Sequence, residues 1–242
     1  MEHGYLSRQI KQNQIHLEQQ VSERTRELAA ALEQVNKTYD ATILALGSAL
    51  ETRDIETQSH SVRVARYSCL LASRLGLNEV ERLTNIQRGA YLHDIGKIGV
   101  PDAILRKPMS LNDDEWEIMK RHPQIGKDVI EGIEFLRGST PIVYCHHERY
   151  DGKGYPRGLA GDEIPIEARI FAVADAVDAM TSDRPYRKAM SIGKAKQEIQ
   201  RLTGAQFDPQ VAKALYGIED ALLTHEAEET YEGTKRALIL AT

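Results

Sequence analysis

The stretch AYLHDIGKIGVPDAIL (90–105) raises a chemical question, because its apolar helix ends on His93 and Asp94 and Lys97 follows one turn later. Ionised or unpaired polar groups on a buried helix lose hydration, which is costly unless something compensates them. A bound metal can supply that compensation, and so can a salt bridge. The surrounding sequence indicates whether His93 and Asp94 bind a metal or form a structural ion pair.

Five of the chain's eight histidines lie in distinctive helical settings: His60, His93, His122, His146 and His147. A lone histidine on an apolar helix face is usually a hydrogen-bonded core residue, so no single one of them indicates a ligand. Four separate segments each supply one or two of the five. That recurrence favours a shared site over independent core positions.

Carboxylates accompany these histidines. Glu56 lies four residues before His60, so the two side chains share one helix face. Asp175 lies within FAVADAVDAM (171–180), an apolar helix in which a carboxylate needs a partner, and Asp178 follows one turn later. Imidazoles and carboxylates without thiolates fit Fe, Mn, Zn or Ni rather than a structural Cys-bound zinc. The candidate ligands outnumber what one ion requires, so the pattern predicts more than one metal.

A centre with two divalent ions about 3.5–4 Å apart is typical of phosphate ester hydrolysis, because the ions activate water and neutralise charge on the attacked phosphorus. Such a centre answers the question raised by His93 and Asp94. Their polar groups are tolerated on an apolar helix because metals hold them.

Composition limits the class of protein. The 242 residues are 41% hydrophobic and 28% charged, which favours one principal globular domain with an extension. A net charge of -5 argues against bulk nucleic acid as a partner but leaves room for a local basic pocket. No apolar run approaches the roughly 20 residues of a membrane span, and the start MEHGYLSRQIKQNQ (1–14) is polar. We therefore expect no membrane span and a cytoplasmic location.

The two cysteines, Cys69 and Cys145, cannot form a disulfide framework, and free thiols suit a reducing compartment. Cys145 directly precedes His146. It is therefore either a small core residue or a metal ligand, and we favour the core residue.

Helical spacing of apolar residues runs through nearly all of 49–216 without strand alternation, so the predicted fold class is all-α. Gly76 is placed to end a helix over 61–77. Asn112 and Glu115 form a capping-box pattern at a helix start, and Pro123 marks a further boundary. The remaining predicted helical segments are 79–96, 140–150, 166–182 and 191–204.

The segment 10–46 contains no Pro or Gly and indicates one long helix that runs into the main domain. Its larger apolar residues alternate in steps of three and four, the spacing of a coiled-coil seam. The two series of the seam are Thr25, Leu32, Tyr39 and Leu46, and Val21, Leu28, Val35 and Thr42. An intermolecular coiled coil is the favoured interpretation. An amphipathic helix packed on its own domain is the alternative.

Three stretches together resemble the HD-GYP family of bacterial cyclic-dinucleotide phosphodiesterases: HDIGKIGVPDAIL (93–105), HHERYDGKGYPRGLAGDEIPIEARIFAVADAVDAMTSDRPYR (146–187) and FDP (207–209). This family is a branch of the HD metal-dependent phosphohydrolases. A bare His–Asp dipeptide is unspecific, whereas this ordered run is highly specific. The resemblance implies an HD-domain helical bundle. The expected parts are a signalling and dimerisation helix over 1–47, the catalytic domain over 48–216 and a tail over 217–242.

The resemblance also implies the metal ligands. The matching positions are His60, His93, Asp94, His122, His146, His147 and Asp175, with Asp94 as the bridge. Family members with a carboxylate four residues before the first ligand look able to hold a third ion, which adds Glu56 to the candidates. The alternative for Glu56 is a surface ion pair with Arg53 or Arg63. Two or three divalent ions are therefore expected, most readily Fe or Mn, with Ni and Zn as alternatives.

Catalytic and phosphate contacts follow from the same resemblance. Lys97 is expected to point toward the scissile phosphate and to act in catalysis beside Asp94. Arg184 and Arg187 match phosphate-binding positions, and guanidinium groups suit phosphate oxygens. The family often has Lys where Arg187 stands, so the charge is kept while the contact geometry differs.

Further pocket residues are implied with less definite roles. Asp54 and Asp178 match recurrent polar positions near the pocket, and a helix cap or a salt bridge is the alternative for each. Gly154, Tyr155 and Pro156 form the triplet that names the family, in a loop beside the pocket.

The implied activity is hydrolysis of cyclic di-GMP to pGpG, in some members followed by cleavage to GMP. The alternatives are a catalytically weak HD-GYP signalling module, and an HD hydrolase of another phosphoester or of a mixed cyclic dinucleotide. Filled ligand positions and the presence of Lys97 favour the active enzyme. The implied partners are the substrate, a second copy bound through the N-terminal helix, and an upstream sensor or receiver domain or a regulatory protein.

Overall fold

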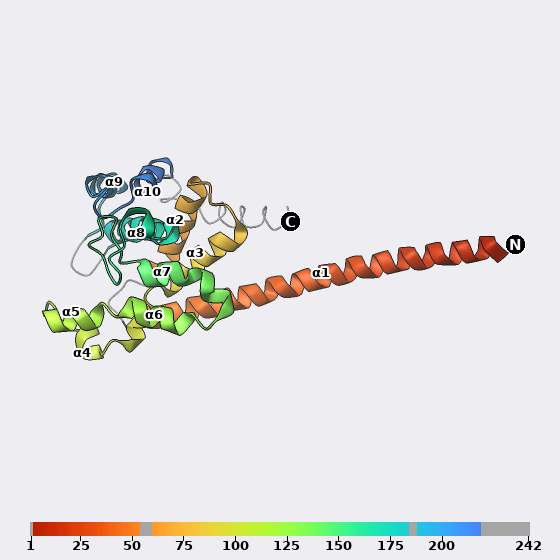
Figure 1. The fold of residues 1–242 in the computed structure, drawn as a ribbon, viewed down its shortest axis with the longest axis horizontal. Coiled ribbons are helices and arrows are strands. Elements are labelled where there is room, and N and C mark those ends of the chain that lie inside the picture. The colour runs from red at the N-terminus through yellow and green to blue at the C-terminus, as the bar shows by residue number, and fades with distance from the viewer. Residues whose placement is uncertain (1, 54–59, 184–187, 219–242) are drawn as a thin grey trace. The chain divides into compact units, whose positions relative to one another are not determined.

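The computed structural model describes residues 2–53, 60–183 and 188–218. Within these ranges the regular elements are helices, and pairing between extended residues is limited to two isolated β-bridges, Asp151 with Ala160 and Thr203 with Phe207 (Figure 1). The expected all-α class is confirmed. In the same ranges no helix combines the length and the apolar character that crossing a bilayer requires.

Contacts divide the chain into two compact units, Met1–Thr42 and Ile43–Thr242. The first unit consists of most of helix α1, which spans Glu2–Glu51 without interruption. The expected long helix is confirmed, and it extends beyond 10–46 at both ends. Side chains of the predicted seam are exposed, among them Val21 at 64%. Pairing through that seam stays a prediction.

The second unit holds the end of α1 and the remaining helices. The α-helices are α2 (His60–Arg74), α3 (Val80–Leu92), α4 (Asp102–Leu105), α5 (Asp113–Met119), α6 (His122–Ile130), α7 (Thr140–Cys145), α8 (Ile166–Thr181), α9 (Ile192–Arg201) and α10 (Pro209–Ala214). The 3₁₀ turns are η1 (Ile95–Gly99), η2 (Glu134–Ser139), η3 (Gly161–Glu163) and η4 (Leu215–Gly217).

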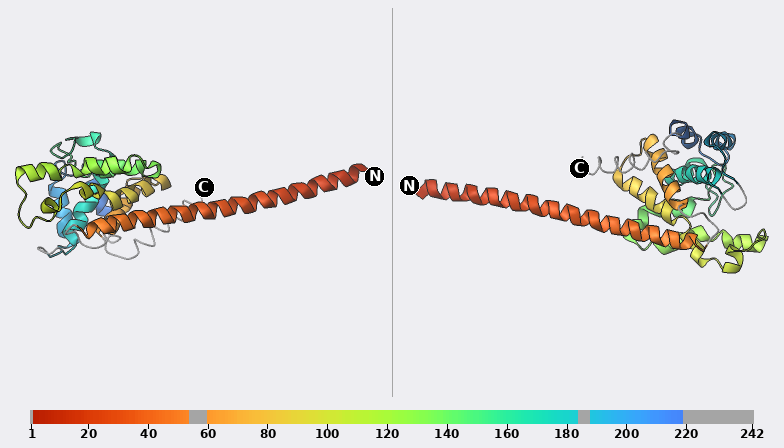
Figure 2. Two further views of the ribbon diagram at one scale, coloured as in Figure 1. Left: turned by 90° about the horizontal axis from the view of Figure 1, so that it is seen from below. Right: turned by 180° about the vertical axis from the view of Figure 1, so that it is seen from behind.

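Helix α8 is the centre of the main hydrophobic core. It packs against α2, α3, α7, α9 and α10, and the views in Figures 1 and 2 show these helices gathered around it. Its Phe171 is almost fully buried, as are Leu71 of α2 and Ile86 of α3. A second, smaller cluster joins Ile43 near the end of α1 to α3, α6 and α7. The helices that carry the candidate ligands are therefore held together by apolar packing.

Local signals end and begin these helices as the sequence predicts. Gly76 follows α2 with a φ of 83°, a left-handed conformation that favours glycine. Asn112 and Glu115 form a complete capping box at the start of α5. Pro123 occupies the first turn of α6, where a missing amide hydrogen is harmless.

Candidate metal centre

Most of the described candidate ligands lie at or just beyond the ends of helices, and Asp175 lies within α8. His60 is the first residue of α2, and His93 and Asp94 directly follow α3. His122 is the first residue of α6, and His146 directly follows α7. A side chain at a helix end can point away from the apolar face of that helix. The ends of four packed helices can therefore direct polar groups into one buried site.

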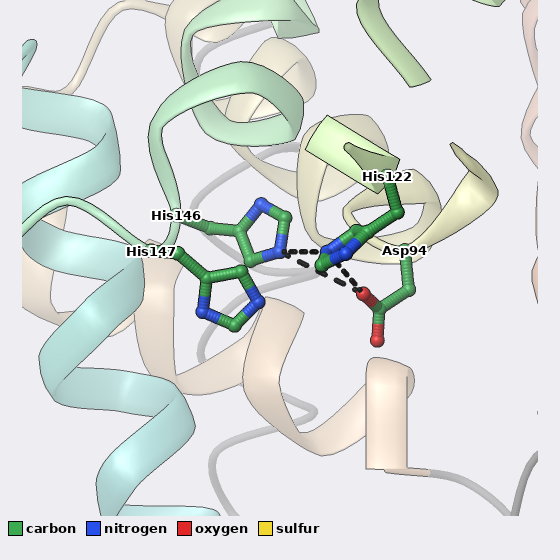
Figure 3. Close-up of side chains that lie close together, drawn as sticks. All are labelled: Asp94, His122, His146 and His147. Atoms are coloured by element: carbon green, nitrogen blue, oxygen red, sulfur yellow. Dashed lines mark hydrogen bonds and ion pairs between the residues drawn. The ribbon is translucent and has the colours of Figure 1, made fainter. Parts of the chain in front are cut away.

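Four of these side chains form a tight cluster. Asp94, His122, His146 and His147 each offer a ligand atom, and these atoms lie within 4.8 Å of one another. Figure 3 shows the side chains pointing toward a common centre. Asp94 Oδ1 lies 3.2 Å from His122 Nε2 and 3.6 Å from His146 Nε2, and the two nitrogens are 3.2 Å apart.

The second oxygen of Asp94 faces a different set of groups. Asp94 Oδ2 lies 3.0 Å from His93 Nε2 and 2.7 Å from Lys97 Nζ. Beyond His93, the His60 ring lies 5.8 Å away between centroids, and His60 Nε2 is 3.3 Å from Asp175 Oδ1. The two oxygens of one carboxylate thus serve two neighbouring groups of candidate ligands.

The rings of this centre are oriented by hydrogen bonds at their other nitrogen. His93 Nδ1 donates to the Ala90 carbonyl at 2.9 Å, and His122 Nδ1 donates to the Met119 carbonyl at 2.9 Å. His146 Nδ1 lies 3.1 Å from a carbonyl of its own helix. A proton held on Nδ1 leaves Nε2 with its lone pair, which is the arrangement found in histidines that bind metals.

These atoms fit a divalent cation. Asp94 Oδ1 is buried and makes no hydrogen bond of good geometry among the residues that the structure describes. The lone pairs of His122 and His146 point toward the same space, and two such nitrogens repel one another unless a positive charge lies between them. Nitrogen and oxygen donors without a thiolate suit Fe, Mn, Zn or Ni. The cluster can hold metal.

Electrostatics keep the donors in their metal-binding forms. Burial alone would raise the pKa of Asp94, but the neighbouring His93 and Lys97 outweigh burial and hold that pKa well below its ordinary value. Burial lowers the pKa of His146 to about 4 and lowers the pKa of His147 well below its ordinary range. At neutral pH Asp94 is therefore a carboxylate, and His146 and His147 are neutral imidazoles.

The loop that contains Gly154, Tyr155 and Pro156 packs directly on this centre. The Tyr155 ring stacks on the His147 ring, with centroids 4.6 Å apart and planes 25° apart. The Tyr155 amide donates to the His147 carbonyl at 3.2 Å. A Cβ at Gly154 would overlap the backbone of His147 and Arg149, so the close approach requires glycine. Pro156 follows in the same turn.

Glu148 holds the far side of this loop, a role that the sequence reasoning missed. Its side chain is buried, and its two oxygens accept the amides of Arg157 at 2.8 Å and of Leu159 at 3.0 Å. The available signal was its position directly after His147. A buried carboxylate beside these rings requires partners, and the following glycine-rich loop offers backbone amides.

A cavity of about 970 Å³ opens beside the centre. Candidate ligands His146, His147 and Asp175 line one part of its wall. Lys153 and Tyr155 line the part formed by the loop, and Lys194 of α9 contributes another part. This volume lies at the upper end of the range for small-molecule sites, about 300–1,000 Å³.

Comparison with known proteins identifies the family. A family model described as "HD domain" matches residues 9–211. The chain belongs to the HD-domain family. Its resemblance to the HD-GYP branch is confirmed by curated relatives at about 40% identity and by the fold.

Two curated relatives illustrate the similarity of this HD-domain chain. It is 41% identical over 211 residues to the cyclic di-GMP phosphodiesterase response regulator RpfG of Xanthomonas campestris pv. campestris, covering 86% of this chain and 54% of that protein. It is 44% identical over 186 residues to a cyclic di-GMP phosphodiesterase of Thermotoga maritima, covering 76% and 50%. The chain thus spans about half the length of the curated relatives it matches.

A solved structure supports the HD fold independently. The crystal structure of a cyclic GMP-AMP specific phosphodiesterase of Vibrio cholerae superposes with a TM-score of 0.62 at 17% identity, covering 78% of this chain and 52% of that chain. Identity at this level is informative about the fold alone. The helical HD arrangement expected from the sequence is confirmed.

Asp178 is buried and forms ion pairs with His60 and Arg63. Its side chain is 1% exposed and is absent from the wall of the large cavity. It lies 2.8 Å from His60 Nδ1, and the Arg63 guanidinium donates to both of its oxygens. These contacts match the salt bridge that was the alternative for Asp178, and a contact with the substrate stays a prediction. In this HD domain Asp178 orients the His60 ring, as an outer partner of a ligand histidine does.

Two other predictions have different outcomes. Cys145 is buried with Ile164 and Ala168 in a small apolar cluster, which confirms the core-residue interpretation. Four further candidate residues lie outside the described residues, so their expected roles stay predictions: Asp54, Glu56, Arg184 and Arg187.

Proposed function

We propose that this HD domain is a metal-dependent phosphodiesterase that hydrolyses cyclic dinucleotides, with cyclic di-GMP as its main substrate and pGpG as its product. One observation carries the proposal: Asp94 directs one oxygen toward His122 and His146 and the other toward His93, beside a cavity of about 970 Å³. The names of the two curated relatives support the same reaction class.

The metal ligands that we propose are His60, His93, Asp94, His122, His146, His147 and Asp175, with Asp94 shared between two ions. Divalent ions held there would supply Lewis acidity and an activated water at neutral pH. The protein's own part is to fix the donors. The Nδ1 hydrogen bonds of His93 and His122 orient both rings, and apolar packing holds their helices.

Lys97 is the proposed catalytic cation. Its ammonium lies 2.7 Å from Asp94 Oδ2 in a largely buried position, so its charge is little screened by water. A phosphorus under attack gains negative charge on its oxygens, and a fixed cation beside them stabilises that charge without reorganising. Lys97 therefore contributes more to the transition state than to binding of the ground state.

The remaining cavity wall suits the other parts of an anionic cyclic dinucleotide. Lys153 and Lys194 extend from different elements, and within the described ranges their ammonium groups have neither a hydrogen bond nor an ion pair. Cations on the wall of a cavity favour a ligand with phosphates. We propose that Arg184, Arg187 and Asp54 add contacts from segments outside those ranges, and that Gly154, Tyr155 and Pro156 form the loop beside the substrate.

We propose Fe or Mn as the native metal, with Ni or Zn as substitutes, and a third ion bound with the help of Glu56. Elemental analysis of metal-loaded protein tests this stoichiometry. Roughly three ions per chain, falling to roughly two in Glu56→Ala, support the third site. Equal metal content in both proteins removes Glu56 from the ligand set.

We further propose that the enzyme is cytoplasmic, dimerises through α1 and receives its signal from a partner domain or regulatory protein. The exposed apolar seam supports pairing between two copies of α1. The chain covers only 54% of a relative named as a response regulator, which leaves room for an input module in proteins of that kind.

The experiment that tests this function is turnover by metal-loaded protein of cyclic di-GMP, cyclic GMP-AMP, cyclic di-AMP and a simple phosphodiester, with identification of each product. The proposal expects cyclic di-GMP to be opened to pGpG fastest. Preference for the mixed ring would change the substrate while keeping the reaction class. Binding without turnover at full metal content would instead indicate a signalling module.

A further inference from the structure

Arg53 follows the end of α1 and contacts the segment that carries Lys97. Its guanidinium donates to three backbone carbonyls: Nη1 to Lys97 at 3.1 Å and to Ile98 at 3.3 Å, and Nη2 to Val100 at 2.9 Å. The same guanidinium forms an ion pair with Asp102, with Nε 2.9 Å and Nη2 2.7 Å from Oδ1. One side chain therefore joins the end of α1 to the whole turn after the metal centre.

The carbonyls that Arg53 binds belong to the 3₁₀ turn η1 and the residue after it. The last carbonyls of a short helical turn lack partners within the turn, so a donor from outside stabilises one conformation. On its other side η1 lies against α6, where a Cβ at Gly96 would overlap the His122 carbonyl. Arg53 and α6 thus hold the turn from two directions, and Lys97 is part of the turn.

Arg53 is itself held in place. Its carbonyl accepts a hydrogen bond from Arg106 Nε at 3.0 Å. Two residues earlier, Glu51 Oε1 accepts the Ser61 amide at 2.9 Å and the Ser61 hydroxyl at 2.5 Å, directly beside His60. The end of α1 also borders a small cavity of about 20 Å³ together with His93, Asp94 and Lys97. A donor fixed in this way can determine where η1 lies.

We propose that Arg53 is a positioning residue for catalysis: it fixes η1 so that the Lys97 ammonium stays beside Asp94 and the reacting phosphate. This inference rests on the proposed phosphodiesterase function. Arg53 contacts carbonyls and Asp102 and acts through Lys97. The planar guanidinium spans several acceptors at once, a geometry that lysine and glutamine lack.

A double-mutant cycle tests the proposal in metal-loaded full-length protein. Arg53→Gln should lower kcat about tenfold, as a misplacement below 1 Å does, with KM and metal content close to wild type. In the Lys97→Ala background the same substitution should change kcat less than about twofold, because the group through which Arg53 acts is gone. Asp102→Asn is the matched control. It removes the ion pair and leaves the three carbonyl contacts, so its kcat should stay within about twofold of wild type.

A second readout needs no turnover. Acetylation of Lys97 by an amine reagent, followed by mass spectrometry with Lys153 as the internal reference, should be at least about threefold faster in Arg53→Gln, because η1 opens locally. If wild-type protein proves inactive on cyclic dinucleotides, the proposed function fails while this measurement still reports on Arg53. Where Arg53→Gln fails to fold, Arg53→Lys takes its place in both experiments.

Three results would overturn the proposal. The first is an additive cycle, in which Arg53→Gln costs as much activity without Lys97 as with it. The second is an equal loss of kcat in Arg53→Gln and Asp102→Asn, which would reduce the role of Arg53 to its ion pair. The third is unchanged acetylation of Lys97.

Discussion

Asp94 Oδ2 lies 2.7 Å from Lys97 Nζ, while Asp94 Oδ1 lies 3.2 Å from His122 Nε2 on the other side of the carboxylate. One residue therefore contacts both the proposed catalytic cation and the histidine cluster. The lysine ammonium thus lies beside Oδ2, and the His122 nitrogen lies beside Oδ1. Substitutions of Asp94 and of Lys97 should consequently have different effects: the first on metal binding, the second on stabilisation of the reacting phosphate.

Lys97→Ala is expected to keep metal and lose turnover. Removing one charge partner of a transition state costs about 10²-fold in kcat, and the ligands of the ions stay in place. Elemental analysis and steady-state kinetics on the same preparation provide the measurement. Lys120→Ala, which removes a half-exposed cation paired with Glu117, is the control and should behave as wild type. Loss of metal from Lys97→Ala would show that the lysine supports the centre structurally.

Glu148→Gln is expected to loosen the loop around Gly154. The glutamine amide replaces one acceptor with a donor, which faces the Arg157 or Leu159 amide and leaves it without its hydrogen bond. An unsatisfied buried donor costs about 1–3 kcal/mol of unfolding free energy. Chemical denaturation measures this loss, and KM for the substrate should rise with it.

Glu163→Gln is the matched control for that experiment, because its exposed carboxylate accepts a single amide, that of Ala160, in the same loop. Its effect should stay within about 0.5 kcal/mol. Equal stability losses in the two variants would argue against a special role for Glu148.

The Cys145 thiol should be unreactive at pH 8. Burial raises the pKa of the Cys145 thiol to about 11, and the Glu148 charge acts in the same direction. Deprotonation is needed for alkylation, so the thiolate fraction at pH 8 is about 10⁻³ and increases only as the pH approaches 11. Iodoacetamide labelling followed by mass spectrometry should modify Cys145 rapidly after denaturation and slowly before it. Rapid labelling of the native protein would contradict its burial.

Leu32→Glu should weaken dimerisation. Leu32 is exposed in the predicted seam, and a charge placed in an apolar coiled-coil interface opposes association. Light scattering should give a dimer for wild type and a monomer for the variant at the same concentration. Ala30→Glu lies off the seam and should leave the dimer intact. A wild-type protein that is monomeric at high micromolar concentration would refute pairing through this helix.

Most of the fold could be predicted because its signals are local. Gly76 and the capping box at Asn112 mark helix ends through backbone chemistry that needs no tertiary context. The histidines and Asp94 could be grouped because four helical segments repeat the same residue types and the ordered motifs are specific.

The support around the site could not be predicted in the same way. Arg53 and Val100 are 47 residues apart in sequence, and Arg63 and Asp178 are 115 apart. Such contacts depend on how helices pack, which spacing within one helix does not reveal. Asp178 illustrates this limit: a carboxylate in an apolar helix predicts a partner, but the identity of that partner is a tertiary property.

Metal content and cyclic di-GMP turnover of Asp94→Ala, measured together beside wild type and the exposed control Asp114→Ala, test the central claim most directly. The shared carboxylate predicts that wild type and the control hold at least about two ions and open the ring, whereas Asp94→Ala loses both metal and turnover. Wild-type turnover by Asp94→Ala at full metal content would contradict the assignment of the centre.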